Sequence, residues 1–316
     1  MNVEVMLKTQ CMAMRQDVLS MELARARSWQ EPLARGAGAA RGMAPRQATR
    51  GIAVIRLYGG LTQRADLMSQ FFGGTCLNDF TDSLRFALAD ESIGQVLIEI
   101  DSPGGSVYGT EEAARAVFQA RQTKPIVAVA NSLAASAAYW IGSQADEFFV
   151  TPGGEVGSIG VWMAHEDLSK ALDGAGRKVT LISAGKNKVE GSPYEPLDPD
   201  AKRFMQSRCD DYYGAFTRDV ARGRNVPVDQ VRRGMGQGRV LGADAALAEN
   251  MVDGVLTFEQ VVQRMQRSGR IGKPAAAAQT QGVKTMSGQM ARNLLALEEA
   301  GWGSQSKGLL NTGSKP

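Results

Sequence analysis

Two short segments of the chain each carry a serine beside small residues, which suits the transfer of an acyl group. The first is Asp101–Gly105, with the sequence DSPGG, and it follows the apolar run VLI at positions 96–98. A Pro-Gly-Gly segment after a buried strand exposes backbone N–H groups that no side chain covers. We therefore predict Gly104 and Gly105 as donors of an oxyanion hole, and we do not expect this segment to supply the nucleophile.

The second segment is Asn131–Tyr139, with the sequence NSLAASAAY, and it places Ser136 among alanines. At an expected loop-to-helix junction, these small side chains leave room for a substrate carbonyl, and the helix N-terminus favours a developing negative charge. We predict Ser136 as the nucleophile, with the N–H of Ala137 as a further oxyanion donor. Taken alone, the segment fits equally well with close helix packing around an incidental serine.

The base that activates such a serine is usually a histidine or a lysine. His165 is the only histidine, so any Ser-His-Asp or Cys-His arrangement would have to use it. It follows an apolar run at an expected strand end, where a structural role is more usual. A desolvated lysine loses its proton more readily and can then accept one from serine. Lys186 and Lys188 would lie on the same side of an extended segment, so periodicity does not choose between them.

Five motifs, in order along the chain, resemble those of the S49 peptidases, which comprise bacterial signal peptide peptidase A and the prohead proteases of tailed phages. The similarity extends from about Gly51 to Val262 and rests on residues 101–105, 134–139, 157–161, 183–188 and 238–254. The resemblance implies that the serine of the Ala-Ser-Ala motif is the nucleophile and that the lysine closing the Gly-x-x-Lys motif is the base. In this sequence these residues are Ser136 and Lys188.

Ser158, in the third of these motifs, has two interpretations. Its hydroxyl could orient the lysine amine as the third member of a triad would. The alternative, which we favour, is that Gly157 and Ser158 form a tight turn between strands.

Strands that alternate with helices predict an α/β fold with a largely parallel sheet. The resemblance implies the Clp/crotonase-like form of this fold, built from repeated β-β-α and βαβ units and followed by C-terminal helices. Strands are expected at residues 52–57, 96–100, 126–130, 147–150, 156–163 and 178–183. Helices are expected at residues 77–88, 113–118, 134–142, 199–222 and 242–250.

The composition divides the chain into three regions. Residues 1–50 are predicted to be a mobile N-terminal arm, because the stretch from Ala34 to Arg50 has too few large apolar residues to pack. Residues 51–267 are predicted to be the peptidase domain. Residues 268–316 are predicted to be a linker, with an alanine run at 275–278, followed by a short amphipathic helix that begins near Ser287.

Charge and cysteine usage exclude several other classes of protein. The net charge is +3 with basic and acidic residues interspersed, so we expect no nucleic-acid partner. The three cysteines lack CxxC spacing, which disfavours a disulfide framework or a zinc site, and we expect no cofactor or metal. No apolar run is long enough for a membrane helix, which indicates a cytoplasmic protein without stable membrane insertion.

Four functions are compatible with these features. The favoured one is a serine endopeptidase, resembling a prohead protease, that cleaves scaffold and capsid proteins and itself and forms a homo-oligomer. A soluble peptidase similar to signal peptide peptidase is the alternative within the family. A crotonase-type acyl-CoA enzyme, which uses the same paired backbone donors, is the alternative from another class. A scaffold protein with a degenerate site is a further, non-enzymatic alternative.

Overall fold

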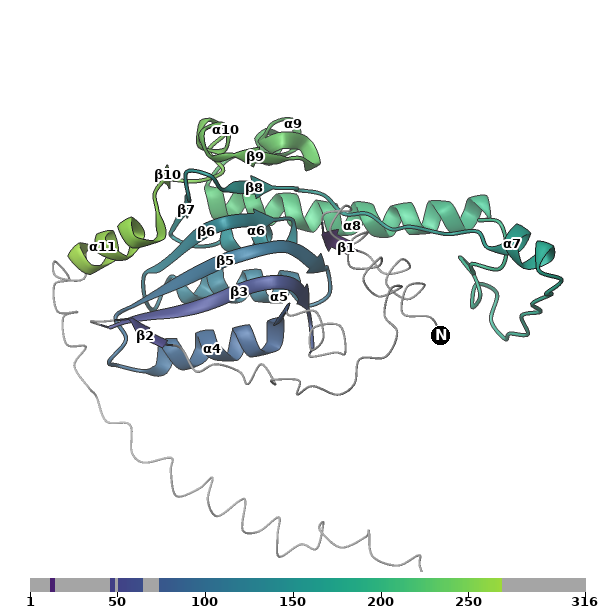
Figure 1. Cartoon of the computed structure of the whole chain (residues 1–316), viewed down its shortest axis with the longest axis horizontal. Helices are drawn as coiled ribbons and strands as arrows, with labels where there is room; N and C mark the ends of the chain where they lie inside the picture. The colour runs from purple at the N-terminus through teal and green to yellow at the C-terminus, as the bar shows by residue number, and fades with distance from the viewer. Residues whose placement is uncertain (1–11, 15–45, 49–50, 65–73, 269–316) are drawn as a thin grey trace, which may run out of the picture. The chain divides into compact units, whose positions relative to one another are not determined.

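A largely parallel β-sheet lies at the centre of the computed structural model (Figure 1). The structure describes residues 12–14, 46–48, 51–64 and 74–268, all within the unit Met1–Ile271; the second unit, Gly272–Pro316, contains no described residue. Along its main path the sheet has the order β10, β7, β6, β5, β3, β2. The strands are β1 (Met12–Met14), β2 (Arg46–Ala48), β3 (Ile52–Thr62), β4 (Gly74–Cys76), β5 (Gln95–Ser106), β6 (Ile126–Ala135), β7 (Glu147–Val150), β8 (Glu155–Gly157), β9 (Val240–Gly242) and β10 (Gly254–Val255).

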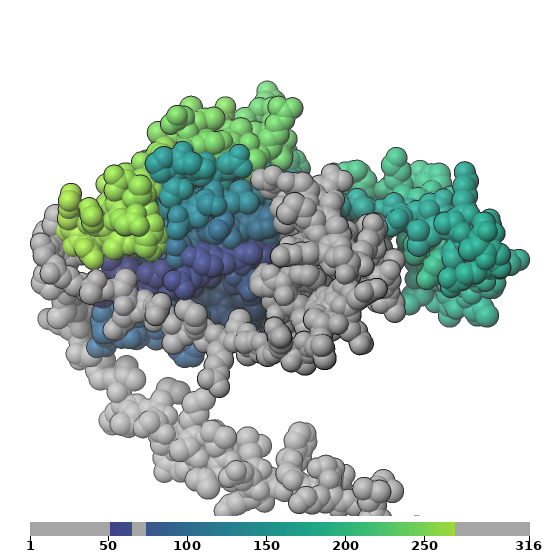
Figure 2. Space-filling view, in the orientation of Figure 1, coloured from purple at the N-terminus to yellow at the C-terminus, as the bar shows by residue number. Residues whose placement is uncertain are grey.

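Helices connect these strands and cover the sheet on both faces. They are α4 (Leu77–Ala89), α5 (Thr110–Ala120), α6 (Ala137–Gly142), α7 (Ser169–Gly174), α8 (Pro199–Arg224), α9 (Val228–Arg233), the 3-10 helix η1 (Met235–Gly238), α10 (Ala243–Ala248) and α11 (Phe258–Ser268). Neighbouring residues of a strand point to opposite faces. Ile98 therefore belongs to the hydrophobic core that the sheet forms with α4, α5, α6 and α8. Leu97 belongs to the second, smaller hydrophobic core, which the sheet forms with α11. The space-filling view shows α11, in yellow-green, lying against the sheet (Figure 2).

Parallel pairing fixes the register of the central strands relative to one another. β3, β5, β6 and β7 pair in that order, and Ile98 of β5 lies between Ile55 of β3 and Ala128 of β6. The α/β class and the largely parallel sheet followed by helices are thus confirmed. In the described part of the chain, no helix combines the length and apolar character that crossing a bilayer requires.

Most predicted elements are present, but two strand predictions were wrong. Residues 178–183 form no strand, and Ile182 there is 95% exposed; β-branched residues form strands only where a neighbouring strand and a packed face receive them. The strand predicted at 156–163 ends at Gly157, because Gly157 and Ser158 both have positive φ, at 125° and 54°.

Three other strands run further than predicted. β3, β5 and β6 extend to Thr62, Ser106 and Ala135, so the DSPGG segment belongs to a strand rather than to a loop. Within the predicted N-terminal arm, β1 and β2 pair antiparallel with β5 and β3, so two short parts of the arm join the sheet. The predicted linker and terminal helix after residue 268 lie outside the described residues.

Candidate active site

Ser136 lies where the central strand β6 ends. In the last register of β6, Ala134 pairs with Ser102 of β5 on one edge, and Ala135 pairs with Gly157 of β8 on the other. β6 then stops and α6 begins with Ala137. The sequence thus brings Ser136 to the carboxyl end of a parallel strand, the edge at which α/β proteins place their ligands.

The backbone of Ser136 is held in an uncommon conformation. Its φ is 56° and its ψ is −121°, and its N–H donates to the carbonyl of Gly157 at 2.7 Å, while its own carbonyl accepts from Trp140 at 2.9 Å. Positive φ in a non-glycine residue costs about 1–3 kcal/mol and persists where the surroundings enforce it, often at functional sites. The side chain is 1% exposed, and no hydrogen bond of its hydroxyl is present among the described residues.

Buried polar contacts hold the helix that follows Ser136. The indole N–H of Trp140 donates to the carboxylate of Asp219 at 2.8 Å, and its ring stacks on Phe216 with 4.5 Å between centroids. The hydroxyl of Tyr139 donates to the carbonyl of Met251 at 3.0 Å, and burial raises the pKa of Tyr139 well above its ordinary value, so the hydroxyl keeps its proton. These contacts fasten α6 to α8 and to the segment before β10.

Sequence reasoning missed these positioning residues. The available signal was Asp219, a charged residue between the buried residues Phe216 and Val220 of α8. A buried carboxylate requires a donor, and a buried tryptophan requires an acceptor for its N–H. These requirements could have paired Asp219 with Trp140, which directly follows the motif that contains Ser136.

Gly104 and Gly105, the predicted oxyanion donors, lie on β5 one strand away from Ser136. A Cβ at Gly105 would overlap the carbonyl oxygen of Leu61, so only glycine fits this position. Gly104 has a φ of 100°, and its N–H donates to the hydroxyl of Ser102 at 3.2 Å. Donation to an oxyanion would therefore require Gly104 to give up or share this long hydrogen bond.

Ser102 has a structural role in this arrangement. Its side chain is fully buried, and its hydroxyl donates to the carbonyl of Gly59 at 2.6 Å, which ties β5 to β3. The structure thus places the two serines differently: Ser102 is bonded within the sheet, and Ser136 follows a strand end.

Lys186 and Lys188 do not lie beside Ser136 in a buried pocket of the single chain. Both are exposed and belong to a turn, in which the N–H of Lys188 donates to the carbonyl of Gly185 at 3.2 Å. Our premise of an extended segment was therefore wrong, and the single chain leaves Lys188 exposed. This turn and α7 lie beyond the N-terminal part of α8, away from the sheet (Figure 1). The pairing of Ser136 with Lys188 stays a prediction.

His165 and Ser158 both lie in the segment that follows β8. The Nε2 atom of His165 lies 3.0 Å from the carbonyl oxygen of Ser192, and the N–H of Leu168 donates to the carbonyl of Pro193 at 2.8 Å, so both contacts join the two sides of the segment between β8 and α8. Ser158 directly follows β8, as Ser136 follows β6, and its N–H donates to the carbonyl of Arg239 at 2.8 Å. This hydrogen bond continues the pairing of β8 with β9, and Ser158 lies in neither a strand nor a turn, so both interpretations of Ser158 stay predictions.

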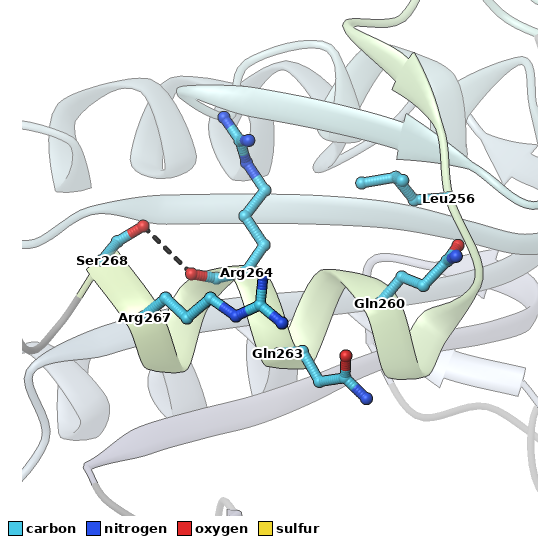
Figure 3. Close-up of a pocket in the computed structure, with 6 residues that line it drawn as sticks. All are labelled: Leu256, Gln260, Gln263, Arg264, Arg267 and Ser268. Carbon is cyan, nitrogen blue, oxygen red and sulfur yellow. Dashed lines mark hydrogen bonds between the residues drawn. The ribbon is translucent and has the colours of Figure 1, made fainter.

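A separate hollow of about 500 Å³ runs along α11 (Figure 3). The guanidinium of Arg264 in its lining pairs with Glu147 at the start of β7, and the carbonyl of Met265 accepts from Gln95 at the start of β5. The hollow therefore lies at the opposite end of the strands from Ser136. It is lined by Leu256, Gln260, Gln263, Arg264, Arg267 and Ser268.

The site thus places a strained serine at a strand end, next to glycine backbone on the neighbouring strand. Comparison with known proteins assigns a class to it. Residues 119–271 match the family model described as peptidase family S49. This span includes Ser136 and Lys188 and begins after the DSPGG segment. The match supports the resemblance to this family that the motifs indicate.

The sequence relatives include two phage proteins. The head-tail preconnector protein GP5 of Enterobacteria phage P21 is 35% identical over 206 residues, which cover 64% of this chain and 41% of that protein. The capsid assembly protease C of Escherichia phage lambda is 35% identical over 175 residues, which cover 55% of this chain and 40% of that protein. The matched part is thus about two fifths of the length of these relatives.

Among solved structures, a mutant of the 1510-N membrane-bound stomatin-specific protease aligns with a TM-score of 0.44 and 14% identity, over 69% of this chain and 86% of that one.

Proposed function

We propose that this protein is a serine endopeptidase in which Ser136 is the nucleophile. The observation that carries the proposal is the position of Ser136, which stands in a strained conformation at the carboxyl end of β6, beside the glycine-rich end of β5. A serine that ends a central parallel strand in this way lies at the edge of the sheet where α/β proteins bind their ligands. The match of the surrounding residues to peptidase family S49 supports the same assignment.

The chemistry requires a base, and Lys188 is our candidate. Its neutral amine would take the proton of the Ser136 hydroxyl as the oxygen attacks the carbonyl carbon of the scissile peptide bond. The negative charge on the carbonyl oxygen would be met by N–H groups of Gly104, Gly105 and Ala137. The lysine would then return the proton to the leaving amine. Water would hydrolyse the acyl-serine and restore the enzyme.

Lys188 would reach Ser136 only when its segment packs against another surface. The segment between β8 and α8, together with the start of α8, exposes large apolar side chains: Ile182 is 95% exposed and Phe204 is 58% exposed. Exposed apolar groups of this size commonly mark an interface. Packing of this segment in a homo-oligomer would bury these groups and desolvate the lysine. We therefore propose that the complete site forms on assembly.

The names of the phage relatives favour a role in capsid maturation. One relative is called a capsid assembly protease, and another a head-tail preconnector protein. We propose that this protein cleaves scaffold and capsid proteins of a phage or prophage in the bacterial cytoplasm, and also cleaves itself. A housekeeping role similar to that of signal peptide peptidase is the competing assignment.

Cleavage of fluorescently labelled casein tests the proposed activity. Wild type should release small fluorescent peptides, and Ser136→Ala should release none above background while keeping its fold, because the loss of one hydroxyl leaves no sizeable cavity. Ser132→Ala is the matched control. Ser132 is an exposed serine near the end of the same strand, and its hydroxyl donates to Asp101 at 3.0 Å. Equal cleavage by Ser136→Ala and wild type would contradict the proposal.

A further inference from the structure

The last residues of β5 have a strand on each edge. On one edge, Gly104 and Gly105 pair with β3. On the other edge, β6 pairs with β5 only as far as Ser102. A strand has two edges, and β3 occupies the first edge of β5 as far as Gly105. Any further strand at Gly104–Ser106 must therefore lie on the edge that β6 leaves free when its chain turns into Ser136 and α6.

β1 takes this free edge. It pairs antiparallel with β5, with Met12 opposite Ser106 and Met14 opposite Gly104. β1 therefore runs along β5 in the direction of Ser102, whose partner on β6 is Ala134. The N-terminal segment thus approaches the strand end that carries the nucleophile from the side of the predicted oxyanion donors.

We propose that Met12–Met14 occupies the position of a bound polypeptide substrate and holds the active site closed until it is displaced or cut. An extended peptide that adds to a free strand edge is a common mode of recognition, in which backbone hydrogen bonds supply affinity without demanding particular side chains. Such an edge binds the chain's own segment and a substrate in the same way, so the two compete. This inference rests on the proposed endopeptidase activity.

Two features of the site agree with a closed state. Ser136 is 1% exposed, so a substrate carbonyl reaches its hydroxyl only after a rearrangement. Gly104 and Gly105 are both buried as well.

The chain that carries Met12–Met14 is also tethered to the sheet through β2, which pairs with β3 from Arg46 to Ala48. A tethered competitor acts at a high effective concentration, so a short strand can block the edge although its pairing is weak.

Proline substitution tests the role of β1 in the full-length chain. Successive N–H groups of an antiparallel strand point to opposite edges, so one of any two adjacent N–H groups points toward β5. Two adjacent prolines therefore remove one donor toward β5, whichever of the two residues supplies it. In the Ala13→Pro/Met14→Pro variant, we expect casein to be cleaved at least about fivefold faster, the factor for about 1 kcal/mol of one lost hydrogen bond. The matched control is Ala39→Pro/Ala40→Pro, which lies outside the described strands and should leave the rate unchanged.

Hydrogen exchange measured by mass spectrometry reports docking independently of catalysis. In the Ser136→Ala background, the prolines at 13 and 14 should speed exchange in the peptide that contains Gly104–Ser106, and exchange across β7 should stay unchanged if the fold is intact.

Peptide inhibition tests the competition directly. A synthetic peptide of residues 8–20 should inhibit casein cleavage by the proline variant. The same peptide with both prolines should not inhibit it.

The outcomes separate this inference from the proposed function. Unchanged exchange at Gly104–Ser106 would show that β1 does not occupy the edge and would overturn the inference. Faster exchange without faster casein cleavage would show that β1 docks but does not block the site, and would also overturn it. If no variant cleaves casein in a manner that depends on Ser136, the proposed activity fails and the inhibitory role fails with it, while the exchange data still report the docking.

Discussion

The indole N–H of Trp140 donates to the carboxylate of Asp219 at 2.8 Å, and this bond joins the short helix after Ser136 to the long helix α8. Asp219 also accepts from Arg222 at 2.9 Å, so its charge is compensated on the side away from the indole. The position of Ser136 therefore depends on α8, which follows it by more than sixty residues in the sequence.

Trp140→Phe should lower the free energy of unfolding by about 1–3 kcal/mol, because the buried carboxylate of Asp219 loses a donor. Urea denaturation measures this loss. We also expect kcat for casein to fall while KM changes little, because the change displaces Ser136 and leaves the peptide-binding edge intact. An unchanged kcat in Trp140→Phe would show that the Asp219 bond stabilises the fold without positioning Ser136.

For the base, Lys188→Ala should abolish casein cleavage, whereas Lys186→Ala should keep most of it. The reason is chemical: only one amine takes the serine proton, and the Gly-x-x-Lys match assigns that role to Lys188. Both lysines are exposed in the single chain, so neither substitution should disrupt its fold, as measured by circular dichroism. The reverse pattern of activity would assign the base to Lys186.

The segment between β8 and α8 should mediate assembly. We expect wild type to form a homo-oligomer larger than the 33.8 kDa chain, as measured by light scattering coupled to gel filtration. Ile182→Asp places a charge on a side chain that is 95% exposed, and it should shift the protein toward the monomer and reduce cleavage together. Phe86→Asp is the control, since Phe86 is 70% exposed but lies on α4. Loss of assembly in the Phe86 variant alone would move the interface to α4.

The pair formed by Asp253 and Arg224 should make stability depend on acid pH. Burial favours the protonated carboxyl, but two hydrogen bonds of 2.8 Å from Arg224, together with its charge, outweigh burial and hold the pKa of Asp253 below its ordinary value of 3.8. A depressed pKa contributes stability above the unfolded value, and this contribution is lost as the pH falls through the folded value.

Asp253→Asn should therefore be less stable than wild type at pH 7 by about 1–3 kcal/mol, the range for hydrogen bonds to a charged group. The difference should shrink as the pH falls below about 4. Thermal unfolding of both proteins from pH 7 to pH 3 measures it. Asp229→Asn, whose carboxylate pairs with Arg233 on the surface of α9 at 3.5 Å, should behave as wild type throughout. A gap between Asp253→Asn and wild type that stays constant with pH would contradict this explanation.

The central sheet could be predicted from the sequence because its strands are buried on both faces. The continuous apolar runs at 96–98 and 126–130 have no other stable place in an α/β fold, and both are strands in the structure. Ser136 could be placed at a helix start for a similar reason, since its flanking alanines allow close packing. These features are local, so residue type and spacing suffice to reveal them.

The remaining features depend on partners that lie far away in the sequence. Residues 178–183 have the composition of a strand but find no neighbour to pair with, so they stay exposed. Met12–Met14 carries no distinctive pattern, yet it pairs with Gly104–Ser106 because β6 leaves that edge free. The bond between Trp140 and Asp219 likewise depends on how α8 packs. None of these contacts is visible in local periodicity.

Acylation of the protein by an activated ester most directly tests whether Ser136 is the nucleophile. On brief incubation with the p-nitrophenyl ester of N-acetylalanine, the serine oxygen should displace p-nitrophenol and retain the acyl group. Intact-mass measurement and peptide mapping of the acid-quenched protein should then locate one N-acetylalanyl group on Ser136. Ser132→Ala should be labelled as wild type is, and Ser136→Ala should not be labelled. An equal label on Ser136→Ala, or a label that maps to another serine in wild type, would contradict the account.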